Sequence, residues 1–169
     1  MSCDQLPVLI ECPNWANFPE YDEFLYQLFK QDFIDSQPLY EKKKVVIRKH
    51  PLVNGKEQTF FHVTSKDYKE GEERFPDPRR CERIQWIRKF IENNFCLDSC
   101  NECDGIKVWE EEYKKNKRIY LLLEEEKYIV ILEKRENYCL LITAYYLDYP
   151  HTLDKLLKKY NAYIKQKAP

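Results

Sequence analysis

One histidine and one threonine in the first half of the chain have types and spacing that suit proton transfer. Residues 57–64 have the aromatic and β-branched composition of a strand, in which side chains two positions apart share a face. On that prediction His62 and Thr64 point to one side, and Phe61 and Val63 point to the core. A histidine titrates near neutral pH, so His62 is a candidate general acid or base.

Three arginines follow at the start of a second predicted element. Asp77 and Pro78 are residue types that favour the N-cap and the first helical position, and they predict a helix over residues 78–94. Positive charge is disfavoured in the first turn by the helix dipole, and a bound anion would reverse that penalty. The arginines in question are Arg79, Arg80 and Arg83.

The histidine and the arginines together fit chemistry at a phosphodiester. Such a reaction needs a proton-transfer group, and it needs fixed cations where charge develops on the phosphoryl oxygens. Each feature also has a structural interpretation. His62 can be a half-buried residue bonded to its neighbours, and the arginines can form a solvated turn paired with nearby glutamates.

Hydroxyl-bearing residues end the last predicted strand and form the second half of the candidate site. Thr143, Tyr145 and Tyr146 could position a phosphate or stack on a base. Strand propensity alone also accounts for a threonine and two tyrosines at these positions. Strict alternation places Thr143 and Tyr145 on one face with Cys139 and Leu141.

The order of the remaining elements predicts an α+β fold built on a twisted antiparallel sheet of four to five strands. An N-terminal arm and helix occupy residues 1–44, and the core of a single domain occupies residues 45–169. Asn54-Gly55 indicates a hairpin turn, and residues 65–76 are expected to be a charged loop. The expected helices cover residues 19–35, 78–94 and 151–165, and the expected strands cover residues 45–48, 57–64, 106–109, 118–123, 127–133 and 138–146.

Composition excludes several classes of protein. The formal net charge of −1 argues against non-specific coating of nucleic acid but allows a local basic pocket. We expect no secretory signal and no membrane span, because no window approaches the roughly 18 apolar residues that a span requires. Seven cysteines without the spacing of a small secreted scaffold indicate reduced thiols and a cytoplasmic location.

A cysteine-rich segment allows a zinc hypothesis. Cys96, Cys100 and Cys103 supply three thiols, and a fourth ligand would come from Cys3, Cys12 or a histidine. Cys81 is a poor partner, because a continuous helix would separate it from Cys96 by about 22 Å. The spacing is not that of a standard zinc finger or ribbon, and no glycine-rich phosphate loop is present. We therefore predict no metal and no cofactor.

Three short motifs resemble a known family. FHVTS at 61–65, PDPRRCERIQW at 76–86 and LLITAYY at 140–146 are similar to motifs of phage- and toxin-associated members of the barnase/EndoU/colicin/RelE-like (BECR) ribonuclease superfamily. The resemblance covers about residues 57–165. It implies a metal-independent, toxin-like endoribonuclease that cleaves RNA, with tRNA as one candidate, by attack of the 2′-hydroxyl on the phosphodiester.

The resemblance also implies a role for each candidate residue. His62 would act as the general base or acid, and Arg79 or Arg80 would bind the scissile phosphate together with Thr143. The expected substrate-binding residues are Thr64, Arg83, Tyr145 and Tyr146. A cognate immunity or antitoxin protein would be a partner. The rival hypothesis is a non-catalytic phage accessory or immunity protein that binds RNA or protein on the same scaffold, and a third is a zinc-stabilised binding module.

Overall fold

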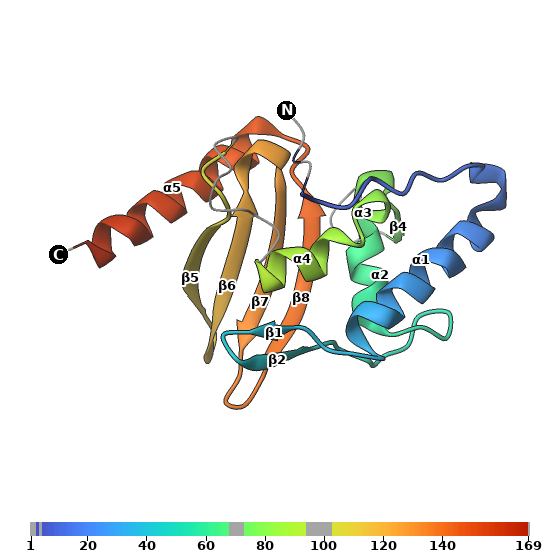
Figure 1. Cartoon of the computed structure of the whole chain (residues 1–169), viewed down its shortest axis with the longest axis horizontal. Coiled ribbons are helices and arrows are strands. Elements are labelled where there is room, and N and C mark those ends of the chain that lie inside the picture. The colour runs from blue at the N-terminus through green and yellow to red at the C-terminus, as the bar shows by residue number, and fades with distance from the viewer. Residues whose placement is uncertain (1–2, 4, 68–72, 94–102, 169) are drawn as a thin grey trace.

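The computed structural model describes residues 3, 5–67, 73–93 and 103–168. Helices and strands alternate in the first half of the chain, whereas the second half is a strand meander closed by a helix (Figure 1). The α-helices are α1 (Phe18–Phe33), α2 (Gln58–Thr64), α3 (Pro78–Glu82), α4 (Trp86–Glu92) and α5 (Pro150–Lys167). The strands are β1 (Leu39–Tyr40), β2 (Lys43–Val46), β3 (Ser65–Asp67), β4 (Arg74–Pro76), β5 (Lys107–Tyr113), β6 (Asn116–Leu123), β7 (Tyr128–Lys134) and β8 (Cys139–Tyr146).

The main sheet has six strands in the order β1-β2-β8-β7-β6-β5. Strands β5 to β8 form the antiparallel meander that the sequence predicts. Strand β2 pairs with β8 in parallel, with Val45 opposite Cys139, and β1 adds an antiparallel edge. The fold is therefore α+β, as expected. The predicted number of four to five strands was too low, and the prediction of a purely antiparallel sheet missed the parallel pairing of β2 with β8.

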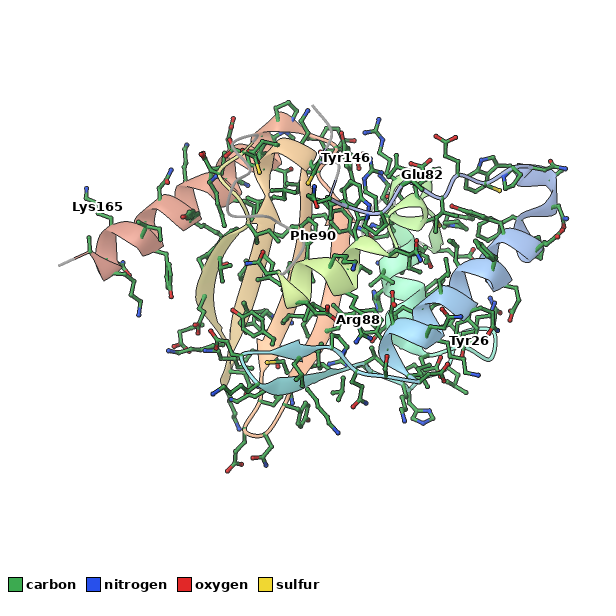
Figure 2. All side chains as sticks on the ribbon, in the orientation of Figure 1. Tyr26, Glu82, Arg88, Phe90, Tyr146 and Lys165 are labelled. Carbon is green, nitrogen blue, oxygen red and sulfur yellow. The ribbon has the colours of Figure 1, made fainter. Side chains whose placement is uncertain are left out.

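Helices cover both faces of this sheet (Figure 1). One core lies between the sheet and α1, α2 and α4, and α4 contributes Phe90 to it (Figure 2). The ring of Phe90 packs edge-on against Tyr128 of β7, with the ring centres 5.3 Å apart. A second core lies on the opposite face, where Leu156 of α5 packs near Trp109 of β5.

Residues 58–64 are helical, and the prediction of a strand over 57–64 was wrong. The buried residues of α2 are Thr59, Phe60, Val63 and Thr64, a spacing that matches one face of a helix. Phe60 packs against Tyr26 at 5.2 Å and Phe29 at 5.4 Å, both on α1. Burial against α1 therefore overrides the strand propensity of this segment.

The predicted helix over 78–94 is two shorter helices. Asp77 caps α3 as predicted, because its side chain accepts a hydrogen bond from the backbone amide of Arg79 at 3.3 Å. At about 3.6 residues per turn, one straight helix would direct Ile84 and Trp86 to nearly opposite sides. The break between α3 and α4 lets both residues be buried. Asn93 ends α4 in the left-handed conformation, which is common at the residue where a helix stops.

Two further local predictions need correction. The charged segment 65–76 was expected to be a loop, but its described part contains the paired strands β3 and β4. Asn54 and Gly55 do form a tight turn with positive φ at both residues, as predicted. The turn closes a single bridge between Val53 and Lys56 and leads into α2, so no returning strand follows it.

Candidate active site between α2 and β8

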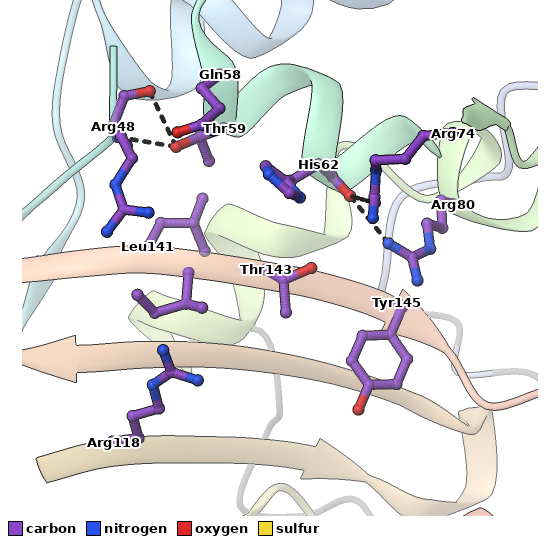
Figure 3. A pocket seen from close by; sticks show the side chains of 11 residues that line it. Arg48, Gln58, Thr59, His62, Arg74, Arg80, Arg118, Leu141, Thr143 and Tyr145 are labelled. Carbon is purple, nitrogen blue, oxygen red and sulfur yellow. Dashed lines mark hydrogen bonds between the residues drawn. The ribbon is translucent and has the colours of Figure 1, made fainter. Parts of the chain in front are cut away.

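A pocket of about 310 Å³ opens between α2 and β8 (Figure 3). It combines one imidazole, several guanidinium groups, hydroxyl groups and a short apolar floor. None of the lining residues is acidic, so the donor set suits an anion. The lining residues are Arg48, Gln58, Thr59, His62, Arg74, Arg80, Arg118, Leu141, Ile142, Thr143 and Tyr145.

Helix α2 directs His62 into this pocket. The opposite face of the helix is buried against α1 by Phe60 and against the core by Val63. Because His62 lies one position before Val63, it points away from that core and toward β8 (Figure 3). The imidazole is half-buried, and burial is the largest cause that lowers its pKa, followed by the positive charges of Arg74, Arg48 and Arg80. His62 is therefore neutral and able to accept a proton near pH 7.

Two arginines bind the C-terminal end of the same helix. Arg80 donates to the backbone carbonyl oxygens of His62 at 2.9 Å and Ser65 at 2.8 Å. Arg74 donates to the same two carbonyls, at 3.4 Å in the case of His62. The last carbonyls of a helix lack intrahelical partners and carry partial negative charge. The guanidinium groups therefore fix the end of α2 and at the same time line the pocket.

Arg118 of β6 approaches the pocket from the sheet and is held by a buried carboxylate. Its Nε lies 3.1 Å from an oxygen of Glu133, which is only 4 % exposed. Arg135 contacts the same carboxylate at 2.6 Å, and Asn116 donates to it at 3.2 Å. Glu133 thus compensates much of the charge on Arg118 and fixes its position.

A β-bulge in β8 shapes the floor of the pocket. Thr143 pairs with Ile131 of β7, whereas Leu141 pairs with the next residue, Leu132, so Ile142 is the extra residue. The alternation of side chains between the two faces of β8 is interrupted at Ile142. Leu141 therefore does not share a face with Tyr145, contrary to the prediction. Leu141 and Ala144 enter the first core, and Tyr145 lies on the other face.

The pocket gathers some of the sequence-predicted site residues. His62, Arg80, Thr143 and Tyr145 all line it. Burial raises the pKa of Tyr145, so its phenol keeps its proton at neutral pH. The guanidinium carbon of Arg80 lies 5.3 Å from the centre of this tyrosine ring.

The other predicted residues lie elsewhere. Thr64 is buried and donates to the backbone carbonyl oxygen of Phe60 at 2.9 Å, as expected for the residue two positions after His62 on a helix. Arg79 and Arg83 both lie over the ring of Tyr146, at 4.4 Å and 4.6 Å. None of these four predicted residues, Thr64, Arg79, Arg83 and Tyr146, lines the pocket.

Three lining arginines were not predicted from the sequence. Arg48 follows β2, Arg74 begins β4 and Arg118 lies within β6. They are 26 and 44 residues apart along the chain and share no motif. The pairing of β2, β8, β7 and β6 brings Arg48 and Arg118 to the pocket, and the separate β3–β4 pair that follows α2 brings Arg74 there.

The zinc hypothesis falls largely outside the described residues, which include neither Cys96 nor Cys100. Cys103 accepts a hydrogen bond from the backbone amide of Gly105 at 3.3 Å. Within the described part of the chain, no group of three or more His, Cys, Asp and Glu residues could hold a metal ion. No helix formed by the described residues is both long and apolar enough to cross a membrane.

Comparison with protein-family models, with curated proteins and with solved structures gives no match for this chain.

Proposed function

We propose that this protein is a metal-independent endoribonuclease whose reaction takes place in the pocket between α2 and β8. The observation that carries the proposal is that one pocket without acidic residues holds His62, Thr143, Tyr145 and four arginines. Residues separated by more than 90 positions meet there in the combination that phosphodiester chemistry requires. RNA, with tRNA as one candidate, is the proposed substrate, and an immunity or antitoxin protein is the proposed partner.

The proposed reaction uses the 2′-hydroxyl of the substrate as the nucleophile. His62, neutral because of its lowered pKa, takes the proton of that hydroxyl as the oxygen attacks the adjacent phosphorus atom. The bond from phosphorus to the 5′-oxygen of the next nucleotide breaks, and that oxygen takes a proton from the Tyr145 phenol. The products are a 2′,3′-cyclic phosphate and a free 5′-hydroxyl, and solvent returns the proton from His62 to Tyr145.

Arg80, Arg118 and Thr143 would stabilise the transition state. Charge accumulates on the non-bridging oxygens of the pentacovalent phosphorus, and fixed donors lower its energy because they need no reorganisation. Arg80 is already held by the backbone of α2, and Arg118 is held by Glu133. Thr143 offers a hydroxyl donor from the bulged part of β8.

A non-catalytic RNA-binding protein on the same scaffold is the second candidate. The observation that favours it is that the guanidinium groups of Arg74 and Arg80 already donate hydrogen bonds to backbone carbonyl oxygens of α2. In addition, His62 is the only histidine in the pocket. His151, at the start of α5, stacks on Tyr149 and is exposed. Such a pocket could bind a phosphate without acting on it.

The test is RNA cleavage by the purified protein in the presence of excess EDTA. We expect cleavage products that end in a 2′,3′-cyclic phosphate, identified by mass spectrometry. His62→Gln should lower the rate by about 10²–10⁴-fold and leave RNA affinity within about twofold. His151→Gln is the matched control and should cleave like the wild type. Cleavage that needs an added divalent metal, or that survives His62→Gln, would refute the mechanism.

A further inference from the structure

Arg48 differs from the other pocket arginines because its positive charge is uncompensated. Arg74 and Arg80 donate to backbone carbonyls, and Arg118 pairs with Glu133. Within the described residues, the guanidinium of Arg48 forms neither a hydrogen bond nor an ion pair, and the residue is exposed. A cation that is left without a partner beside a pocket is the group that gains most from an incoming anion.

The backbone of Arg48 is nevertheless fixed. Its amide donates to the hydroxyl of Thr59 at 2.8 Å, and its carbonyl oxygen accepts from the backbone amide of Thr59 at 3.1 Å. The same hydroxyl donates back to that carbonyl at 3.2 Å. Thr59 is itself only 2 % exposed. Arg48 thus carries an exposed side chain on a backbone that is hydrogen-bonded to the first turn of α2.

The pocket cations flank His62 on two sides. Figure 3 shows Arg48 on one side of the imidazole, and Arg74 and Arg80 on the other side. A nucleic acid strand carries one phosphate per nucleotide, so a strand that crosses this pocket presents more than one anion to it. A single scissile phosphate at His62, Arg80 and Thr143 would leave Arg48 unused.

We propose that Arg48 forms a separate subsite, which binds the phosphate next to the scissile phosphate on the same strand. This inference rests on the proposed ribonuclease function. It adds that the site binds at least two consecutive phosphates of the same strand. Arg48 neither donates nor accepts the transferred proton. Its planar guanidinium binds the neighbouring phosphate in a bidentate manner and thereby aligns the strand along α2.

The experiment compares three short ligands that lack the nucleophile. They are a 2′-deoxy dinucleotide without terminal phosphate, the same dinucleotide with a 5′-phosphate, and the same dinucleotide with a 3′-phosphate. Dissociation constants are measured by NMR titration at several salt concentrations for the wild type, Arg48→Ala and Lys49→Ala. Lys49 is the matched control, because it is adjacent and exposed and carries the same charge but does not line the pocket.

For the wild type, we expect one of the two terminal phosphates to strengthen binding by about tenfold. In Arg48→Ala that gain should fall to about twofold or less, and the salt dependence should lose about one unit of slope. For the ligand without terminal phosphate, the dissociation constants of the wild type and Arg48→Ala should agree within about twofold. Lys49→Ala should keep the full gain. Thermal melting of Arg48→Ala confirms that it is folded, since the bonds from Thr59 involve only the backbone of Arg48.

The inference is overturned if neither terminal phosphate strengthens binding to the wild type, or if Arg48→Ala keeps the gain. RNA cleavage, measured in parallel, tests the ribonuclease proposal separately. A gain that depends on Arg48 in a protein that cleaves no RNA would leave the subsite standing and remove the catalytic proposal. RNA cleavage by a protein whose binding gains nothing from a terminal phosphate would support the catalytic proposal and remove the Arg48 subsite.

Discussion

Arg80 donates a hydrogen bond from its guanidinium to the backbone carbonyl oxygen of His62, 2.9 Å away. The guanidinium that we propose as a phosphate ligand also holds the end of the helix that carries the candidate base. Its Nε lies 3.5 Å from a carboxylate oxygen of Asp77, the residue that caps α3. Arg80 connects α2, α3 and the pocket, so its effects on stability and on activity are expected to be coupled.

Arg80→Ala should lower both stability and RNA affinity. The substitution leaves the carbonyls of His62 and Ser65 with fewer donors, and hydrogen bonds from charged groups contribute about 1.5–3 kcal/mol each. Because Arg74 donates to the same carbonyls, we expect a loss of about 2 kcal/mol in the free energy of unfolding. Urea denaturation measures the stability, and RNA binding below the denaturation range measures the affinity.

Arg79→Ala is the matched control for this substitution. The Arg79 side chain is 53 % exposed, lies over Tyr146 and approaches Asp148 only at 3.9 Å. We expect its loss to cost less than about 1 kcal/mol and to leave cleavage near the wild-type rate. A larger effect on cleavage from Arg79→Ala than from Arg80→Ala would mean that the phosphate binds outside the pocket.

Patterns that depend on local order were predictable from this sequence. The meander of β5 to β8, the amphipathic helices α1 and α5, and the cap at Asp77 follow from periodicity and residue type. The segment 57–64 was misassigned because aromatic and β-branched residues have strand propensity in isolation. What makes it helical is the burial of Phe60 against α1, which lies about 30 residues away in the chain.

The site was predictable only in part, for a similar reason. His62 stands out because of its residue type, and Arg80 stands out because of its position in a predicted helix start. Arg48 and Arg118 reach the pocket through sheet pairing, and a bulge at Ile142 sets the face of Thr143. Neither the strand order nor the bulge leaves a signal in the residue types of a single sequence.

Glu133→Gln should destabilise the protein. Glu133 is buried and compensates two guanidinium groups, those of Arg118 and Arg135. Neutralising it leaves these cations close together without a counter-charge, and breaking a buried ion pair typically costs about 3–5 kcal/mol. We expect a loss of about 3 kcal/mol by urea denaturation and weaker RNA binding through a misplaced Arg118.

The control for Glu133→Gln is Glu112→Gln. The Glu112 side chain is 74 % exposed and pairs with Lys117 at 3.8 Å, so its neutralisation should change stability by less than about 0.5 kcal/mol. Equal melting temperatures for the two variants would contradict the proposed structural role of Glu133.

Metal analysis of the purified protein tests the cysteine hypothesis. We expect well below one zinc per chain, and we expect replacement of Cys96, Cys100 and Cys103 by Ser to cost little stability. Structural zinc supplies much of the folding free energy of a domain that depends on it, so its loss would be conspicuous. A stoichiometric zinc together with a large drop in melting temperature on substitution would support the zinc-stabilised alternative.

His62 should also contribute to the pH dependence of stability. Its pKa is lowered in the fold, first by burial, so the unfolded chain binds more protons between the folded pKa and the ordinary value of 6.5. The stability that His62 contributes is therefore fully present above pH 6.5 and is lost as the pH falls through the folded pKa. In His62→Gln this part of the acid destabilisation should be absent, as measured by urea denaturation at a series of pH values.

The pH dependence of cleavage should follow the same group. Because the neutral imidazole of His62 accepts the proton, kcat/KM should rise with pH through a limb centred below 6.5 and then level off. Arg48 is one of the cations that lower this pKa, so Arg48→Ala should move the limb to higher pH, whereas Lys49→Ala should not. NMR titration of the His62 imidazole in both variants gives the same shift without turnover. A wild-type limb above pH 6.5, or a limb that Arg48→Ala leaves in place, would contradict the assignment of His62 as the base.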